Sequence, residues 1–171
     1  MTHNTHSPQT RWAREVLKAH FEGRQPERIP DEVLRQQAGC FVSLHNPDES
    51  LRGCIGTIMP TKATLEEEIK TNAISAAFMD PRFDPLQKGE LEDLVISVDV
   101  LGEPESISSF DELDPKVYGV IVSAGNKRGV LLPDLPGIDK VEQQLHIAMQ
   151  KAGIADGTPI AVHRFKVHRY H

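Results

Sequence analysis

Apolar residues recur at the spacing of an α-helix in three segments of the chain. The first, residues 8 to 22, follows a serine, begins with a proline as many helices do, and is ended by a glycine. The second, residues 64 to 79, opens with a threonine that has a glutamate three places later, the arrangement of a capping box. The third, residues 140 to 152, also ends at a glycine. These patterns predict three main helices.

Alternation of apolar and polar residues marks the strands. Residues 39 to 45 and 51 to 58 flank the turn-rich sequence Asn-Pro-Asp-Glu-Ser and therefore predict a β-hairpin. The clearest alternation lies in residues 92 to 104, where apolar side chains occupy every second position. A second hairpin is predicted within residues 119 to 133, around a Gly-Asn turn, and a last strand within residues 159 to 170.

The order of these elements predicts an α+β fold. Hairpins dominate the connections between strands, so the sheet is largely antiparallel, and about three main helices pack on it. Strands and helices do not alternate as they do in a doubly wound α/β protein. A length of 171 residues suits one domain, which we expect over residues 8 to 171, after a flexible polar N-terminus of residues 1 to 7.

Composition argues against several classes of protein. The net charge of −6 and the low aromatic content of 5% supply neither a phosphate-binding track nor stacking platforms, so nucleic-acid binding is not expected. No apolar run approaches the length of a membrane span, and no apolar leader segment opens the chain. Two cysteines are too few for a disulfide framework. We therefore expect a cytoplasmic protein with free thiols.

The most unusual stretch is Leu-Arg-Gly-Cys-Ile-Gly, at residues 51 to 56, inside a predicted strand. Strand geometry sets Arg52, Cys54 and Gly56 on one face. A guanidinium about 7 Å from Cys54 along that face would stabilise a thiolate. Gly53 and Gly56 remove side chains beside the thiol, so a ligand can approach closely. Together with Arg52, this space suits a carboxylate or a phosphate, that is, a small anionic ligand.

The register of the first hairpin decides whether Cys40 belongs to the same site. If His45 pairs with Leu51, then Val42 faces Cys54. Cys40 would lie diagonal to Cys54 on the same face, about 7 to 8 Å away, too far for an unstrained disulfide but near enough for a second thiol of the site. A slip of one residue would move Cys40 to the other face.

Several candidate residues have two interpretations each. Cys54 is either reactive or a small buried residue on a strand whose glycines mark a bulge. His45 is either a proton acceptor for Cys54 or an exposed histidine at a turn. Asp80 and Arg82, in the proline-rich loop of residues 80 to 86, form either a functional loop or an ion pair that fixes the turn.

No metal site is predicted, and the sequence does not identify a cofactor. The histidines His163, His168 and His171 have spacings that match no common metal site. The zincin, thioredoxin-like, α/β-hydrolase and P-loop motifs are absent from the sequence.

Taken in order, the strings LRGCIGTI, NAISAAFMDPRFDPL and GVIVSAGNKRGVLLP resemble the AMMECR domain family, whose prokaryotic form is called AmmeMemoRadiSam system protein A. The resemblance covers about residues 8 to 170. It implies an α+β fold with an antiparallel main sheet, a smaller subdomain and a cleft between the two. The signature residues of the family carry over to Arg52, Gly53, Cys54, Gly56, Asp80, Pro81, Arg82 and Phe83.

The resemblance implies no agreed reaction, but it implies a cytoplasmic protein that acts with a Memo-like protein and a radical S-adenosylmethionine enzyme. One hypothesis is a thiol-dependent enzyme with Cys54 as nucleophile, Arg52 as stabiliser of the thiolate, and His45 or Asp80 as proton acceptor. The other is a non-catalytic binding or accessory module for those partners or for a small anionic ligand. Its ligand-binding residues would be Gly53, Gly56, Asp80, Arg82 and Phe83.

Overall fold

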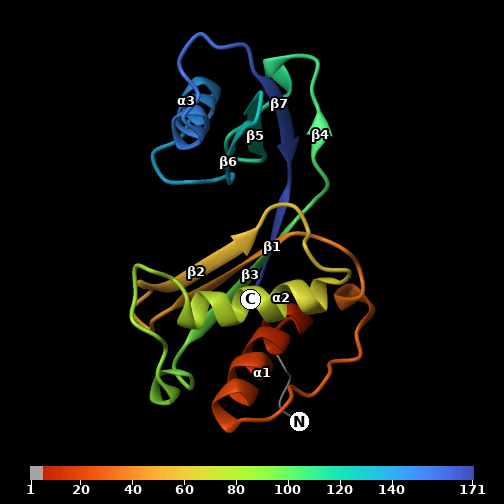
Figure 1. Ribbon diagram of the computed structural model, residues 1–171, viewed down its shortest axis with the longest axis vertical. Coiled ribbons are helices and arrows are strands. Elements are labelled where there is room, and N and C mark those ends of the chain that lie inside the picture. The colour runs from red at the N-terminus through yellow and green to blue at the C-terminus, as the bar shows by residue number, and fades with distance from the viewer. Residues whose placement is uncertain (1–5) are drawn as a thin grey trace. The chain divides into compact units, whose positions relative to one another are not determined.

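The computed structural model of the protein describes residues 6 to 171 (Figure 1). Residues 1 to 5 of the predicted flexible N-terminus lie outside the described residues. The described part has the helices α1 (Pro8–Glu22), α2 (Leu65–Phe78) and α3 (Val141–Ala152). Its single-turn 3-10 helices are η1 (Glu32–Leu34), η2 (Lys88–Glu90) and η3 (Phe110–Glu112). Its strands are β1 (Cys40–His45), β2 (Leu51–Thr57), β3 (Val95–Leu101), β4 (Glu105–Ser106), β5 (Gly119–Ala124), β6 (Lys127–Leu131), β7 (Ala161–Phe165) and β8 (Val167–Tyr170).

The helices end where the sequence places their capping residues. The side chain of Ser7 accepts a hydrogen bond from the N–H of Thr10 at the start of α1, and Thr64 accepts one from the N–H of Glu67 at the start of α2. Gly23 ends α1 in the left-handed region, which glycine enters without steric cost, at φ 66°. The three predicted helices are therefore confirmed, with no boundary shifted by more than one residue.

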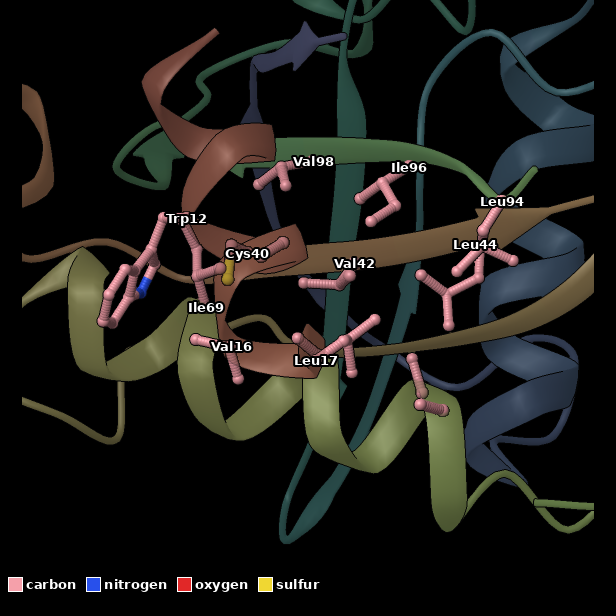
Figure 2. Packing of buried hydrophobic residues seen from close by; sticks show 14 of the residues in the cluster. Trp12, Val16, Leu17, Cys40, Val42, Leu44, Ile69, Leu94, Ile96 and Val98 are labelled. Carbon is pink, nitrogen blue, oxygen red and sulfur yellow. The ribbon is translucent and has the colours of Figure 1, made fainter. Parts of the chain in front are cut away.

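The chain divides into two compact units. The first comprises the chain up to Leu101 together with His168–His171, and its sheet has the strand order β2-β1-β3-β8. Strand β1 pairs antiparallel with β2 and with β3. Helices α1 and α2 lie on the same side of this sheet (Figure 1). Figure 2 shows the resulting core, in which side chains of β1 and β3 meet those of the helices: Trp12, Val16, Leu17, Cys40, Val42, Leu44, Ile69, Leu94, Ile96 and Val98.

The second unit, Gly102–Val167, has its own sheet and its own core. The strand order is β4-β7-β5-β6, and every pairing in it is antiparallel. Helix α3 packs against β5 and β6 and covers the buried side chains of that hairpin. With antiparallel pairing in both units, the predicted α+β fold is confirmed.

The last predicted strand, within residues 159 to 170, is in fact two strands. Lys166 separates β7, which belongs to the second sheet, from β8, which belongs to the first. Alternation of side chains continues through both strands, so a periodic pattern alone does not reveal the break.

The register of the first hairpin corrects the expectation for Cys40. His45 does pair with Leu51, but Leu44 pairs with Gly53, so Arg52 forms a one-residue bulge in β2. Beyond the bulge, Cys54 therefore faces Ser43 and not Val42. Since neighbours along a strand point to opposite faces, Cys40 lies on the core face and Cys54 on the other. Cys40 is fully buried and is not a second thiol of the Cys54 site.

Within residues 6 to 171, no helix combines the length and the apolar character needed to cross a membrane.

Candidate functional site

Cys54 lies on β2, the edge strand of the first sheet, on the face opposite α1 and α2. Its thiol is partly exposed, and its Sγ is 3.3 Å from Oγ of Ser43 on the neighbouring strand. Ser43 in turn pairs with Ser97 of β3. A thiol and two hydroxyls therefore form a row across three strands. Both serines were absent from the predicted site, because only the register identifies which side chains are neighbours across a sheet.

An ion pair between Asp80 and Arg82 closes the open edge of β2 beside Cys54. The N–H of Cys54 donates to Oδ2 of Asp80 at 3.0 Å, and Nη2 of Arg82 donates to the carbonyl oxygen of Cys54 at 3.4 Å. Arg82 also donates to both carboxylate oxygens of Asp80, at 3.0 and 2.8 Å. Because the edge strand has no further strand beside it, these side chains occupy the place of a missing neighbour. We call this pair the Asp80–Arg82 clip.

The loop after α2 is shaped to present the clip. The N–H of Arg82 donates to Oδ1 of Asp80 at 3.1 Å, and the N–H of Phe83 donates to the backbone carbonyl oxygen of Asp80 at 3.1 Å. Pro81 between them favours this turn, because its φ is restricted. The guanidinium of Arg82 lies 5.4 Å from the centre of the Phe83 ring, within the range of a cation–π contact. The loop thus has the ion pair that fixes its turn, and the same ion pair contacts the backbone of Cys54. Both interpretations of the loop, a fixed turn and a functional loop, agree with this geometry.

Both side chains of the clip are held in their charged forms. Hydrogen bonds from Arg82 lower the pKa of the Asp80 carboxyl far below its usual range, against the opposing effect of burial, and the N–H of Cys54 adds to the lowering. Asp80 is almost completely buried, whereas the side chain of Arg82 is 56% exposed. The same pairing raises the pKa of Arg82, with a smaller contribution from the charge of Cys54. Asp80 is therefore a permanent carboxylate, and Arg82 is a cation held near the thiol.

Arg52 is engaged elsewhere. Its Nε and Nη2 donate to the two carboxylate oxygens of Glu90, at 2.7 and 3.1 Å, and Glu90 chiefly, with a smaller effect of Asp84, raises the pKa of Arg52. The side chain of Arg52 is only 12% exposed. The described contacts thus place Arg82, and not Arg52, as the cation beside Cys54. Glu90 was absent from the predicted site because it is 38 residues away in the sequence, with no pattern that links it to Arg52.

The two glycines of the stretch admit protein groups. A Cβ on Gly53 would lie 2.2 Å from the carbonyl oxygen of Ala76, since α2 approaches β2 closely there. A Cβ on Gly56 would lie 2.3 Å from the ring of Phe41. The space beside both glycines is therefore occupied by the fold, by a helix backbone in one case and by an aromatic ring in the other. A ligand-binding role for these two residues stays a prediction.

His45 lies at the end of β1, opposite Leu51 on one side and Val95 on the other. Strand alternation sets it on the same face as Ser43, one row away from Cys54.

An open pocket of about 470 Å³ lies in the same unit, lined by Arg52, Phe83, Asp84, Pro85, Gln87 and Glu90.

Within residues 6 to 171, no three His, Cys, Asp or Glu side chains are grouped so as to hold a metal ion.

Under native conditions, iodoacetamide is expected to alkylate Cys54 at least about tenfold faster than Cys40. Cys54 is partly exposed, whereas Cys40 is fully buried, and burial raises the pKa of the Cys40 thiol to about 12. Mass spectrometry of peptides after timed labelling measures both rates, and labelling in denaturant supplies the control in which the rates converge. Equal native rates would contradict the assignment of the two thiols to opposite faces.

Comparison with known proteins gives consistent matches over nearly the whole chain. The model of the AMMECR1 family matches residues 10–171. A protein of Thermotoga maritima is 49% identical over 168 residues, covering 95% of this chain and 97% of the relative. A protein of Clostridium acetobutylicum is 47% identical, but the match, which covers 95% of this chain, spans only 36% of that longer relative. The crystal structure of an uncharacterised protein of Pyrococcus horikoshii matches with a TM-score of 0.78 and 31% identity, over 94% of this chain and 88% of that one.

Proposed function

The chain belongs to the AMMECR1 family, and from the geometry of its site we propose that it acts through the thiol of Cys54 in thiol-dependent chemistry. One observation carries the proposal: the Asp80–Arg82 clip holds Cys54 by both its N–H and its carbonyl oxygen. The backbone of Cys54 is thereby held next to a guanidinium, and the residue itself is partly exposed. Fixing the reacting group in advance is what catalysis by orientation requires.

The roles of the neighbouring residues follow from their contacts. Cys54 is the nucleophile, and Arg82 stabilises its thiolate in place of Arg52. Ser43 is positioned to donate its hydroxyl hydrogen to the sulfur, from 3.3 Å. Asp80 is a poor proton acceptor, because its pKa is strongly lowered and both of its oxygens accept hydrogen bonds. We therefore assign proton transfer to His45, which shares the face of Cys54.

The rate at which iodoacetamide modifies Cys54 at neutral pH should fall about threefold or more in Arg82→Gln, because the variant removes the cation that stabilises the thiolate. Labelling that is quenched at a series of times, followed by mass spectrometry, measures the rate. Lys88→Gln is the matched control, since it removes the same charge from an exposed residue of the same unit. An unchanged rate in Arg82→Gln would remove the electrostatic support for a reactive thiol.

A second candidate function is a binding or accessory module, and one observation favours it. The Clostridium relative joins a region like this chain to a much longer polypeptide, so in that protein the domain is tied to other parts of one molecule. In this alternative, Cys54 is a non-reacting part of the binding surface. The exposed Arg82 and the partly exposed Phe83 contact a partner or a small anionic ligand. Following the family resemblance, we propose a Memo-like protein and a radical S-adenosylmethionine enzyme as the partners, in the cytoplasm, where the free thiols stay reduced.

Gene replacement distinguishes the two candidates. In a host that lacks its own copy, the thiol-dependent function requires that Cys54→Ser fail to restore the phenotype, while the accessory function requires that this nearly isosteric variant restore it. Arg82→Gln should impair both. Co-purification with the two proposed partners then tests the accessory function directly, and the absence of any complex, stable or cross-linked, counts against it.

A further inference from the structure

A pocket of about 540 Å³ lies in the first unit, between α1 and the chain that leads into β3. Three cationic residues of α1 line it: Arg11, Arg14 and Lys18. Their spacing of three and four residues sets them on one face of the helix. The site around Cys54 contributes no residue to this pocket.

The charge of Arg14 has no carboxylate partner among the described residues. Its Nη1 donates to the carbonyl oxygen of Leu91 at 2.7 Å, and its Nη2 donates to that of Leu94. Burial lowers the pKa of Arg14, which is the expected effect on a cation that has lost water without gaining a counter-ion. Two neutral carbonyls therefore hold a partly desolvated guanidinium at the pocket wall.

Arg11 is more unusual. Its Nε is buried and has no hydrogen-bond acceptor within residues 6 to 171, and its guanidinium forms no ion pair there. A buried donor without an acceptor costs free energy, so such groups are rare in folded proteins. The nearest acid on the same helix is not available to it, because Glu15 accepts from Arg24 at 2.7 and 3.0 Å and from the N–H of Glu27.

Outside α1, the polar side chains of the lining are those of Glu92, Asp93, His6 and the C-terminal His171. Neither carboxylate forms an ion pair with Arg11, Arg14 or Lys18 within the described part of the chain. Both acids are exposed, whereas the two arginines are partly buried. The α1 wall also carries Glu15, but both of its oxygens accept hydrogen bonds from Arg24. Arg11 and Arg14 therefore have no carboxylate partner in the described part of the chain, and a ligand with negative charge complements them.

We propose that this pocket binds the oxyanion of a small molecule, a carboxylate or phosphate group, through Arg11, Arg14 and Lys18. Planar guanidinium groups and an ammonium group are the donors that proteins use for such anions. The site is separate from Cys54 and does not depend on the proposed thiol chemistry. Arg52, which was expected to bind a small anion, is instead paired with Glu90. The pocket beside α1 offers another place for such an anion.

Titration calorimetry of the whole protein with inorganic phosphate and, separately, with citrate tests the proposal. One of the two anions should bind at a single site, and the preferred one identifies phosphate or carboxylate as the natural group. Arg11→Gln should weaken binding about tenfold or more, the effect of losing a charge-assisted hydrogen bond, and Lys18→Gln should weaken it less. Added salt should also weaken binding of the anion by the wild-type protein, because it screens the charges.

Matched variants distinguish binding of the anion in this pocket from non-specific electrostatic attraction to the protein surface. Lys70→Gln removes the same charge from an exposed position of α2, outside the pocket, and should leave binding unchanged. Cys54→Ser should also leave it unchanged, so failure of the thiol proposal and failure of this one are distinguishable. The proposal is overturned if neither anion binds the wild-type protein at millimolar concentration, or if Arg11→Gln and Lys70→Gln weaken binding equally. Arg11→Gln is the primary variant, because Arg14 also holds two backbone carbonyls and its loss would disturb the fold.

Discussion

Replacing Gly53 by alanine is expected to lower the free energy of unfolding of the first unit by about 3 kcal/mol or more. The added Cβ would lie 2.2 Å from the carbonyl oxygen of Ala76 and 3.2 Å from its carbonyl carbon. These are backbone atoms of α2, so no rotamer change relieves the contact, and the whole helix has to move away from β2. Urea unfolding followed by circular dichroism measures the loss.

Gly89→Ala is the matched control, because an added Cβ there meets nothing within 4 Å. We expect its stability to remain within about 0.5 kcal/mol of wild type. The pair of variants also assigns a role to the family signature. If Gly53→Ala were as stable as Gly89→Ala but lost the reactivity of Cys54, the glycine would serve the site; a large loss of stability assigns it to the packing of α2.

The second large effect is expected at the Asp80–Arg82 clip. Asp80→Ala should lower the free energy of unfolding at neutral pH by about 2 to 3 kcal/mol, because it removes the acceptor of the Cys54 N–H and both acceptors of the Arg82 guanidinium. Hydrogen exchange should report the change locally, since the Cys54 amide loses its hydrogen bond and would exchange faster than in the wild type. An unchanged exchange rate would contradict the clip.

The clip also sets a pH dependence. Because Arg82 lowers the pKa of Asp80 in the folded state, the stabilisation is complete above the unfolded pKa of about 4 and is lost as the pH falls towards the folded value. The stability difference between the wild type and Asp80→Asn should therefore be largest near neutral pH and shrink in acid. Asp84→Asn, an exposed carboxylate in the same loop, is the control and should show little difference at any pH. A constant difference for Asp80→Asn down to strongly acidic pH would be inconsistent with the ion pair.

Local sequence patterns determined the elements of this fold. The serine and threonine before α1 and α2 cap their first turns, and the glycine after α1 ends it, because these interactions involve neighbours in the chain. The hairpin of β1 and β2 follows from its turn-rich loop. The α+β class, the three helices and the candidate stretch on a strand of the first hairpin were therefore predictable, and the family was recognisable from its ordered motifs.

The tertiary structure alone decided which side chains form the site. A single bulge residue, Arg52, shifts the register and sends Cys40 into the core while Cys54 stays on the opposite face. The partner of Arg52 is Glu90, 38 residues away, and the carboxylate that holds Cys54 is Asp80, 26 residues away. Contacts over such separations depend on the register of strands and on where a helix ends in space. Periodicity along the chain determines neither, so the sequence by itself identified the stretch around Cys54, and the fold determined its partners.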